Sequence, residues 1–324
     1  MSQTTKPKKN INEQIALLEN KGVEFKIYTK EKAFYFLQNN SYLFKLKSYL
    51  NTYKKKDLDG KTLKYENVDF AYLIDLSTID MHLRRFIIRF VLDIEHALKT
   101  KLIKDFNISQ DNGYICVQNF LNSDKFTNDF INKELNKIDN LTKRNKDMVS
   151  LSQFLLKKYG KDLAIWNFIE IIQFGSLIAF VCYFYERYPN KEFNKIKNGL
   201  HNIKFLRNSA AHNNSMLANL KDNINSPQND VINEIYRLKI FKNKTRNYIK
   251  NQMKNRTIND FIVALFIYNK ICKSKTMKLH CFDDLHKLFQ NRLIRNYNYY
   301  KRSKTIKQRY LFCLRIIKYF QKFK

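Results

Sequence analysis

The sequence predicts an all-α fold, and three observations support this prediction. Hydrophobic residues make up 44% of the 324 residues, which is enough for a folded core and excludes a disordered chain. Glycine and proline are scarce, with 6 and 3 copies, whereas sheet-rich folds use both residues at turns and bulges. The glycines also lie too far apart for a dinucleotide-binding or P-loop motif.

The first helices can be followed in order along the chain. After a polar, basic tail over residues 1–10, Ile11, Ile15 and Leu18 have the spacing of a short amphipathic helix. Thr29 is a suitable N-cap for a second helix. The next segments that we predict are a charged loop at 51–66 and two helical runs at about 67–77 and 79–105.

The run 163–185 is apolar and long enough to span a bilayer. Within it, however, Asn167, Glu170 and Gln173 recur every three residues, which places a polar strip along one side of a helix. A charged glutamate in mid-span would also be costly in lipid. We therefore expect a core helix here, and no membrane partner.

Three regions follow from this survey. We expect the polar tail at 1–10, a helical core at 11–220 and a basic helical region at 221–324. The boundary is placed at the polar loop 221–230, which contains Ser226-Pro227.

The charge of the chain predicts a polyanionic partner. Sixty Lys and Arg against 29 Asp and Glu give a net charge of +31, which a polyanion would compensate while releasing counterions. The 15% aromatic content favours RNA over an anionic membrane, because unpaired bases stack on aromatic rings. The alternatives are a genome-wide bias towards Lys, Asn, Ile and Tyr, and a basic peripheral membrane protein.

The C-terminal stretch 287–324 is the most basic part of the chain. It has twelve Lys and Arg, nine Phe and Tyr, and no acidic residue. We interpret it as part of an RNA-binding surface, while the alternative is an ordinary helical end with a solvated basic face. The basic residues that we assign to RNA binding in the region after 220 are Lys242, Lys244, Arg246, Arg292, Arg295, Lys301, Arg302, Lys307 and Arg309.

Cysteine and histidine usage argues against a metal site. Five cysteines at irregular spacing, with no secretory signal at the start, predict unpaired thiols in a reducing cytoplasm. Cys272, His280, Cys281 and His286 lack the spaced pairs of a zinc site. We expect no metal and no cofactor. A serine hydrolase is also disfavoured, because no Gly-x-Ser-x-Gly motif occurs.

The segment 200–219 is the best candidate for chemistry. Ile196, Leu200, Ile203 and Ala210 mark the inner face of a helix, and Arg207 falls within that stripe. A guanidinium aimed at a core needs either a buried ion pair or a functional cleft. An arginine and His212 in one cleft suit RNA cleavage by the 2′-hydroxyl, because imidazole can move the proton and guanidinium can hold the phosphorane charge.

A second, looser combination lies on the predicted helix 79–105. Arg89 and His96 share a polar strip with His82, Arg85 and Asp93. One interpretation is an RNA-facing surface formed by Arg85, Arg89 and His96. The alternative is a solvated face with an Arg89–Asp93 ion pair.

These segments resemble a known family. Arg207-Asn208-Ser209-Ala210-Ala211-His212 matches the Arg-x(4)-His motif of HEPN ribonucleases. The surrounding residues are similar to AbiD/AbiF-like abortive-infection proteins over roughly residues 11–220. The similar segments are Gly22–Phe25, Asn40–Leu43, Phe70–Leu76, Ile79–Arg85, Asp93–Glu95, and Trp166 with Glu170 and Phe174-Gly175.

The resemblance implies a HEPN-like helical bundle, extended here by the basic C-terminal helices. It also implies a homodimer with a composite cleft, and metal-independent RNA cleavage that leaves a 2′,3′-cyclic phosphate. His212 would be the acid/base, Arg207 the phosphate stabiliser and Asn208 a positioning group. The implied role is antiphage defence. The sequence departs from the family pattern at Asn213-Asn214-Ser215, where a second histidine and an arginine often follow.

The charge and the resemblance together predict a lasting complex with a structured non-coding RNA that restrains the nuclease, as in a toxin–antitoxin pair. The alternative function is a non-catalytic RNA-binding scaffold on a degenerate HEPN fold. Two internal segments, including Arg89 and His96, could also complete the cleft in place of two protomers.

Overall fold

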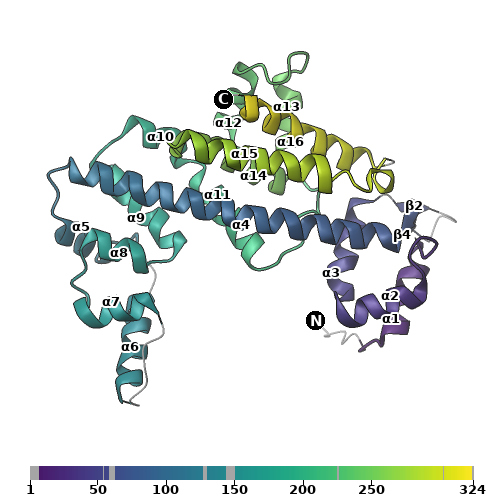
Figure 1. Ribbon diagram of the computed structural model, residues 1–324, viewed down its shortest axis with the longest axis horizontal. Helices are drawn as coiled ribbons and strands as arrows, with labels where there is room; N and C mark the ends of the chain where they lie inside the picture. Colours follow the sequence, from purple (N-terminus) through teal and green to yellow (C-terminus); the bar gives the residue numbers. More distant parts are fainter. Residues whose placement is uncertain are drawn as a thin grey trace. The chain divides into compact units, whose positions relative to one another are not determined.

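The protein is all-α, as the sequence predicts. The computed structural model describes residues 7–53, 55–57, 63–126, 130–143, 150–224, 226–301 and 303–322. Within these ranges the chain forms sixteen α-helices and four strands of two or three residues (Figure 1). Two compact units can be distinguished, and each is discontinuous in sequence. Unit 1 contains the described residues up to Phe90, Phe205–Val263, and those from Ser274 onward; unit 2 contains Val91–Lys204 and Ala264–Lys273.

The loop at 221–230 does not separate the two units, because residues on both sides of it belong to unit 1. The division falls instead within three helices. These are α4 (Phe70–Asn107), α11 (Leu200–Ala211) and α14 (Arg256–Ile271).

The first segment of unit 1 begins with two capped helices. Asn10 and Glu13 form a reciprocal capping box on α1, and the Thr29 hydroxyl caps α2 as predicted. The expected charged loop at 51–66 includes a short antiparallel pair of strands, β2 and β3. Strand β4 pairs in parallel with β1. The elements of this first segment before α4 are α1 (Ile11–Asn20), β1 (Val23–Glu24), α2 (Lys30–Asn39), α3 (Leu43–Ser48), the 3₁₀ turn η1 (Tyr49–Thr52), β2 (Lys55–Asp57), β3 (Leu63–Tyr65) and β4 (Val68–Asp69).

Helix α4 is one continuous helix of 38 residues, so the expectation of two helical runs is wrong. At the position where the runs were expected to separate, the Thr78 hydroxyl donates a hydrogen bond to the carbonyl of Ile74, 2.9 Å away. The polar side chain is thus satisfied by the preceding turn and does not end the helix. Leu76 and Ile79 on either side are buried in the core of unit 1.

The C-terminal segments complete unit 1 with further helices. Helices α15 and α16 lie side by side (Figure 1). The rings of Phe282 and Phe320 stack between them, with centroids 5.0 Å apart. These segments contain α12 (Asn229–Arg237), α13 (Arg246–Met253), the first part of α14, α15 (Lys275–Lys287), the π-helical turn η2 (Leu288–Arg292), the 3₁₀ turn η3 (Tyr297–Tyr299) and α16 (Lys304–Lys322).

Unit 2 packs around an aromatic cluster in which Phe120, Phe168 and Phe180 are fully buried. Besides parts of the three shared helices, it contains α5 (Gly113–Leu121), α6 (Phe130–Lys143), α7 (Leu151–Tyr159), α8 (Ile165–Ile171), α9 (Phe174–Arg187) and α10 (Lys191–Lys197).

The apolar run 163–185 forms two helices, α8 and α9, and not the single core helix that the sequence predicts. The chain is extended at Ile172 and Gln173, where α9 begins. Glu170 on α8 and Gln173, the residue before α9, are exposed, and Asn167 is half-buried. In the part of the chain that the structure describes, no helix has the length and apolar character needed to cross a membrane.

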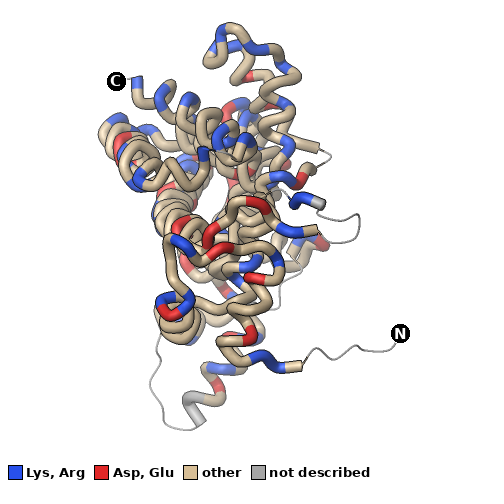
Figure 2. The backbone as a smooth tube through the Cα atoms, turned by 90° about the vertical axis from the view of Figure 1, so that its right-hand side faces the viewer, with Lys and Arg blue, Asp and Glu red and all other residues tan. Residues whose placement is uncertain are grey.

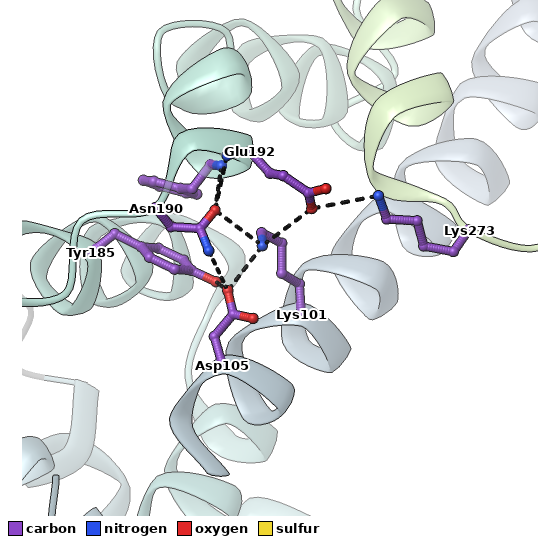
Figure 3. Close-up of polar contacts among 7 residues, drawn as sticks. Lys101, Asp105, Tyr185, Asn190, Glu192 and Lys273 are labelled. Atoms are coloured by element: carbon purple, nitrogen blue, oxygen red, sulfur yellow. Dashed lines mark hydrogen bonds and ion pairs between the residues drawn. The ribbon is translucent and has the colours of Figure 1, made fainter. Parts of the chain in front are cut away.

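A polar network fastens three segments of unit 2 together (Figure 3). Asp105 on α4 accepts hydrogen bonds from Lys101 at 2.9 Å, from the Tyr185 hydroxyl at 2.7 Å and from Asn190 at 3.1 Å. Glu192 on α10 extends the network through ion pairs with Lys101 at 3.7 Å and Lys273 at 3.5 Å. The network thereby joins α4 to the α9–α10 connection and to the end of α14.

Candidate functional site

The Arg-x(4)-His segment lies at the end of α11. Leu200, Ile203 and Ala210 are buried, which confirms the predicted inner face, whereas Ile196, also buried, lies on the preceding helix α10. The helical hydrogen-bond pattern reaches His212, whose N–H donates to the carbonyl of Asn208 at 2.9 Å.

Asn213 ends the helix. Its φ of 56° is in the left-handed region, which asparagine adopts more readily than most residues. The residue after the motif is therefore a helix stop, and the chain turns into the loop that follows.

The structure brings Arg207 and Asn208 together. Arg207 is partly buried, and its Nη1 donates to the Asn208 side-chain oxygen at 3.3 Å. Arg207 forms no ion pair with a carboxylate of the described residues. The buried ion pair that the sequence suggested for Arg207 is therefore not found among these residues.

His212 is exposed, and helical spacing places it on a different side of the helix from Arg207. Five residues correspond to a rotation of about 140° around a regular helix, and no hydrogen bond joins the side chains of Arg207 and His212, both of which the structure describes. A single chain therefore presents the two groups on separate faces of α11.

A buried aspartate holds the loop that follows His212. Asp80 on α4 is fully buried, and its Oδ2 accepts hydrogen bonds from the Tyr49 hydroxyl at 2.7 Å, from Arg84 at 2.6 Å and from the backbone N–H of Met216 at 3.1 Å. Burial raises the pKa of Asp80, while Tyr49 and Arg84 favour its charged form. A fixed backbone contact thus lies four residues beyond the candidate histidine.

Two further contacts fix the start of the same loop. Lys45 on α3 donates to the Asn213 side-chain oxygen at 2.7 Å and to its carbonyl at 3.1 Å. Arg84 also reaches the Asn214 carbonyl at 3.3 Å. Burial, followed by the charge of Arg84, lowers the pKa of Lys45. We call Lys45, Tyr49, Asp80 and Arg84 the loop-anchoring cluster.

Sequence reasoning did not find this cluster. Asp80 and Arg84 are four residues apart on one helix, a spacing that suggests an ion pair. Their burial, and their contacts with a loop 130 or more residues away, carry no local signal in the sequence.

One family model covers all of these residues. A model described as Abi-like protein matches residues 35–218, more than half of the chain. The match contains both the loop-anchoring cluster and the Arg207–His212 segment. This chain belongs to the Abi-like family. None of the curated proteins and none of the solved structures that were compared matches it.

The basic residues predicted on α4 of this Abi-like protein are exposed. They are Arg85, Arg89 and His96. Arg89 pairs with Asp284 on α15 at 2.8 Å. His82, on the same strip, has its pKa lowered by burial and by the nearby Arg292 and Arg85.

Two of the predicted C-terminal cations are engaged inside the Abi-like protein. Arg292 pairs with the buried Asp75 of α4 at 3.0 Å. Nη1 of Arg309 donates to the carbonyl and side-chain oxygens of Gln252 and to the carbonyl of Asn251. Asp75 also accepts hydrogen bonds from Asn296 and Tyr300. The acid-free C-terminal stretch is therefore anchored by a carboxylate from an earlier part of the chain.

The remaining predicted C-terminal cations differ from Arg292 and Arg309 in their exposure. Lys242, Lys244, Arg246, Arg295, Lys301 and Lys307 are exposed. Arg246 donates to Asn233 at 2.7 Å, and Arg302 lies outside the described residues.

The five cysteines all lie in the described residues, and no two of them form a disulfide. Burial raises the pKa of Cys116 and of Cys313 to about 12. Among the described residues, no three His, Cys, Asp or Glu side chains are grouped so that they could hold a metal ion.

Proposed function

We propose that this Abi-like protein is an antiphage defence protein that cleaves RNA through a HEPN-type site formed by Arg207, Asn208 and His212. The observation that carries the proposal is the placement of an exposed histidine on a fixed helix end, with an arginine and an asparagine in contact one turn earlier. Membership of the family supports the role in abortive infection.

The proposed chemistry is transesterification. The imidazole of His212 accepts the proton of the 2′-hydroxyl as its oxygen attacks phosphorus, and the bond to the 5′-oxygen breaks. Arg207 stabilises the negative charge that develops on the phosphorane, and the departing 5′-oxygen takes up a proton. The products are a 2′,3′-cyclic phosphate and a 5′-hydroxyl. The Arg207–Asn208 hydrogen bond supports a positioning role for Asn208.

We further propose that the active form is a homodimer. Because Arg207 and His212 point to different sides of α11, one motif alone does not gather both groups around a single phosphate. Two motifs that face each other across a two-fold axis would supply both groups to one cleft.

The net charge of +31 supports a further proposal, that a structured non-coding RNA is bound and holds the nuclease inactive. Protein purified from cells should then carry one dominant RNA species, which sequencing would identify. A random mixture of fragments would mean non-specific affinity only.

The test of catalysis compares four proteins in cells and as purified samples stripped of nucleic acid. Wild type should arrest growth and cut labelled RNA in the presence of a metal chelator, leaving 2′,3′-cyclic phosphate ends. Arg207→Ala and His212→Ala should lose roughly 1,000-fold or more in rate, because acid–base and electrostatic groups each contribute factors of this order. His201→Ala, at an exposed histidine of the same helix, is the matched control.

If all four proteins are equally harmless and wild type cuts no RNA, the non-catalytic scaffold is the correct function. Cleavage that survives in His212→Ala would assign the chemistry to a different residue.

A further inference from the structure

A pocket of about 240 Å³, lined mainly by polar residues, lies beside the end of α11, entirely within unit 1. Ser209 forms part of one wall, the loop 214–224 a second, and the first turns of α14 a third. Pockets that enclose whole drug-sized ligands are about 300–1,000 Å³. This pocket is therefore of a size for one flat group of a larger ligand, and not for a folded helix.

The pocket is on the His212 side of α11. Phe205, Ser209 and His212 are four and three residues apart, so they share one face of the helix. Phe205 is 48% exposed, and the guanidinium of Arg256 lies 4.6 Å from the centre of its ring. Arg256 also lines the pocket, so the flat Phe205–Arg256 pair lies at its edge. Ser209 is about one helical turn from the candidate catalytic histidine, and Phe205 is about two turns from it.

Several polar groups of the pocket are available for a ligand. Among the described residues, the side chains of Ser209, Asn214, Asp222 and Asn223 make no hydrogen bond or ion pair. Asn255 and Thr257, in contrast, hold the loop through hydrogen bonds to the carbonyls of Asn219 and Met216. The pocket thus has a fixed frame and a set of unused amide, hydroxyl and carboxylate groups.

The charges of the pocket exclude a phosphate as its natural ligand. Arg256 is its only cation among the described lining residues, and it is paired with Asp260 at 3.1 Å. Asp222 adds a carboxylate that is not balanced within the described residues. A carboxylate repels phosphate but accepts hydrogen bonds from the amino and imino groups of a nucleobase. In a chain with a net charge of +31, such a pocket fits the uncharged part of a nucleotide.

We propose that this pocket, the Ser209 pocket, receives one base of single-stranded RNA next to the phosphodiester at His212, and that Asp222 selects guanine. Guanine presents two adjacent N–H donors on its pairing edge, which a carboxylate can bind together, whereas uracil presents one N–H between two acceptors. Asn223 and Ser209 supply partners for the remaining edge, and the Phe205–Arg256 pair supplies a stacking surface. This inference rests on the proposed ribonuclease function.

The test measures base preference by binding and by cleavage. The binding probes are two octamers of 2′-fluoro RNA, which cannot be cleaved because they lack the attacking hydroxyl. They contain only uracil and adenine, except that one octamer has guanine at a single position where the other has uracil. At raised salt, where phosphate contacts weaken, wild type should bind the guanine octamer about tenfold more tightly, in line with the discrimination of about 1–3 kcal/mol that a bidentate contact gives. Asp222→Asn should reduce this ratio to about one to twofold.

Asp124→Asn is the matched control, because it removes an exposed carboxylate of unit 2. It should keep the wild-type ratio. In parallel, sequencing of the ends cut from a random single-stranded pool should show guanine enriched next to the cut for wild type, and not for Asp222→Asn.

A binding ratio that is equal in wild type, Asp222→Asn and Asp124→Asn would overturn the base pocket, whether or not RNA is cut. Cleavage without base preference would retain the nuclease and remove the pocket. A ratio that is lost in Asp222→Asn while no protein cuts RNA would retain the pocket as a binding site on a non-catalytic protein.

Discussion

At the scale of residues, Asp80 is the most constrained side chain near the candidate site. Its Oδ2 accepts three hydrogen bonds, while Oδ1 is buried without a partner among the described residues. A carboxylate in this position depends on Arg84 for charge compensation, because a buried charge that is not paired is costly. The Asp80–Arg84 pair therefore holds the loop after His212, because Asp80 binds the N–H of Met216 and Arg84 the carbonyl of Asn214.

The first prediction concerns this pair. Arg84→Ala should lower the free energy of unfolding by about 3–5 kcal/mol, because it leaves Asp80 buried and uncompensated. Arg89→Ala is the comparison, because it breaks a second Arg–Asp pair, Arg89–Asp284, with a similar N–O distance. The side chains of that pair are about half exposed. Arg89→Ala should cost less than about 1 kcal/mol. Urea unfolding followed by circular dichroism measures both, and equal losses would contradict the role given to burial.

Individual positions differed in how far the sequence could predict them. The inner face of α11 and the cap at Thr29 follow from local spacing and were correctly predicted. The partners of Asp75 and Asp80 could not be predicted, because Arg292 and Met216 are 217 and 136 residues away from them. Contacts over such distances are set by tertiary packing, which one sequence does not display.

At the scale of elements, helix existence was predictable and helix boundaries were not. The periodic apolar residues indicated helices in α4 and in the α8–α9 region, but the numbers of helices were wrong in opposite directions. Thr78 bonds back to Ile74 and lets α4 continue, whereas Ile172 adopts an extended conformation and divides an uninterrupted apolar run. Neither outcome is determined by residue type alone.

The second prediction concerns how α4 is joined to α10 in unit 2. Asp105→Asn should lower the free energy of unfolding by roughly 1–3 kcal/mol, because it replaces the carboxylate that accepts hydrogen bonds from Lys101, Tyr185 and Asn190 with a neutral amide. Glu192→Gln is the control in the same network, since the Glu192 side chain is 62% exposed. It should change stability by less than about 0.5 kcal/mol. The reverse order of losses would contradict a central role for Asp105.

At the scale of the whole molecule, three tyrosines of the described residues are buried and donate to an aspartate. The Tyr49, Tyr185 and Tyr300 hydroxyls donate to Asp80, Asp105 and Asp75 at 2.7, 2.7 and 2.6 Å. In each case burial is the main cause that raises the pKa of the tyrosine well above its usual value, and the neighbouring aspartate adds to it. Both units therefore depend on phenols that must keep their protons.

The third prediction follows from these pairs. An unfolded tyrosine ionises near pH 10, and the native state holds these protons more tightly. Their stabilisation is therefore complete below about pH 10 and is lost as the pH rises further. The urea midpoint of RNA-free protein should fall between pH 9 and pH 11. The midpoint of Tyr300→Phe should fall less over this range. Tyr35→Phe, at a tyrosine that is 65% exposed, is the control, and its midpoint should fall as much as that of wild type. Identical pH dependence in all three would contradict this account.

The charge is also a property of the whole molecule. Lys and Arg occur along nearly all of the backbone in Figure 2, with Asp and Glu distributed among them. The sequence predicted RNA-binding cations on α4 and in the region after residue 220, but Asp75 and Gln252 engage two of the arginines near the C-terminal end. The cations that remain exposed come from several helices, and only the folded chain shows which they are.

The discontinuity of unit 1 has a consequence for synthesis of the protein. The segment up to Phe90 is translated first, yet the two segments that complete this unit begin at Phe205 and at Ser274. A polypeptide released before the last of these segments lacks Arg292, Asn296 and Tyr300, the partners of Asp75. Premature termination therefore yields fragments with an incomplete core, which cellular proteases readily remove. Unit 1 can therefore complete its fold only after the segment that begins at Ser274 has been translated.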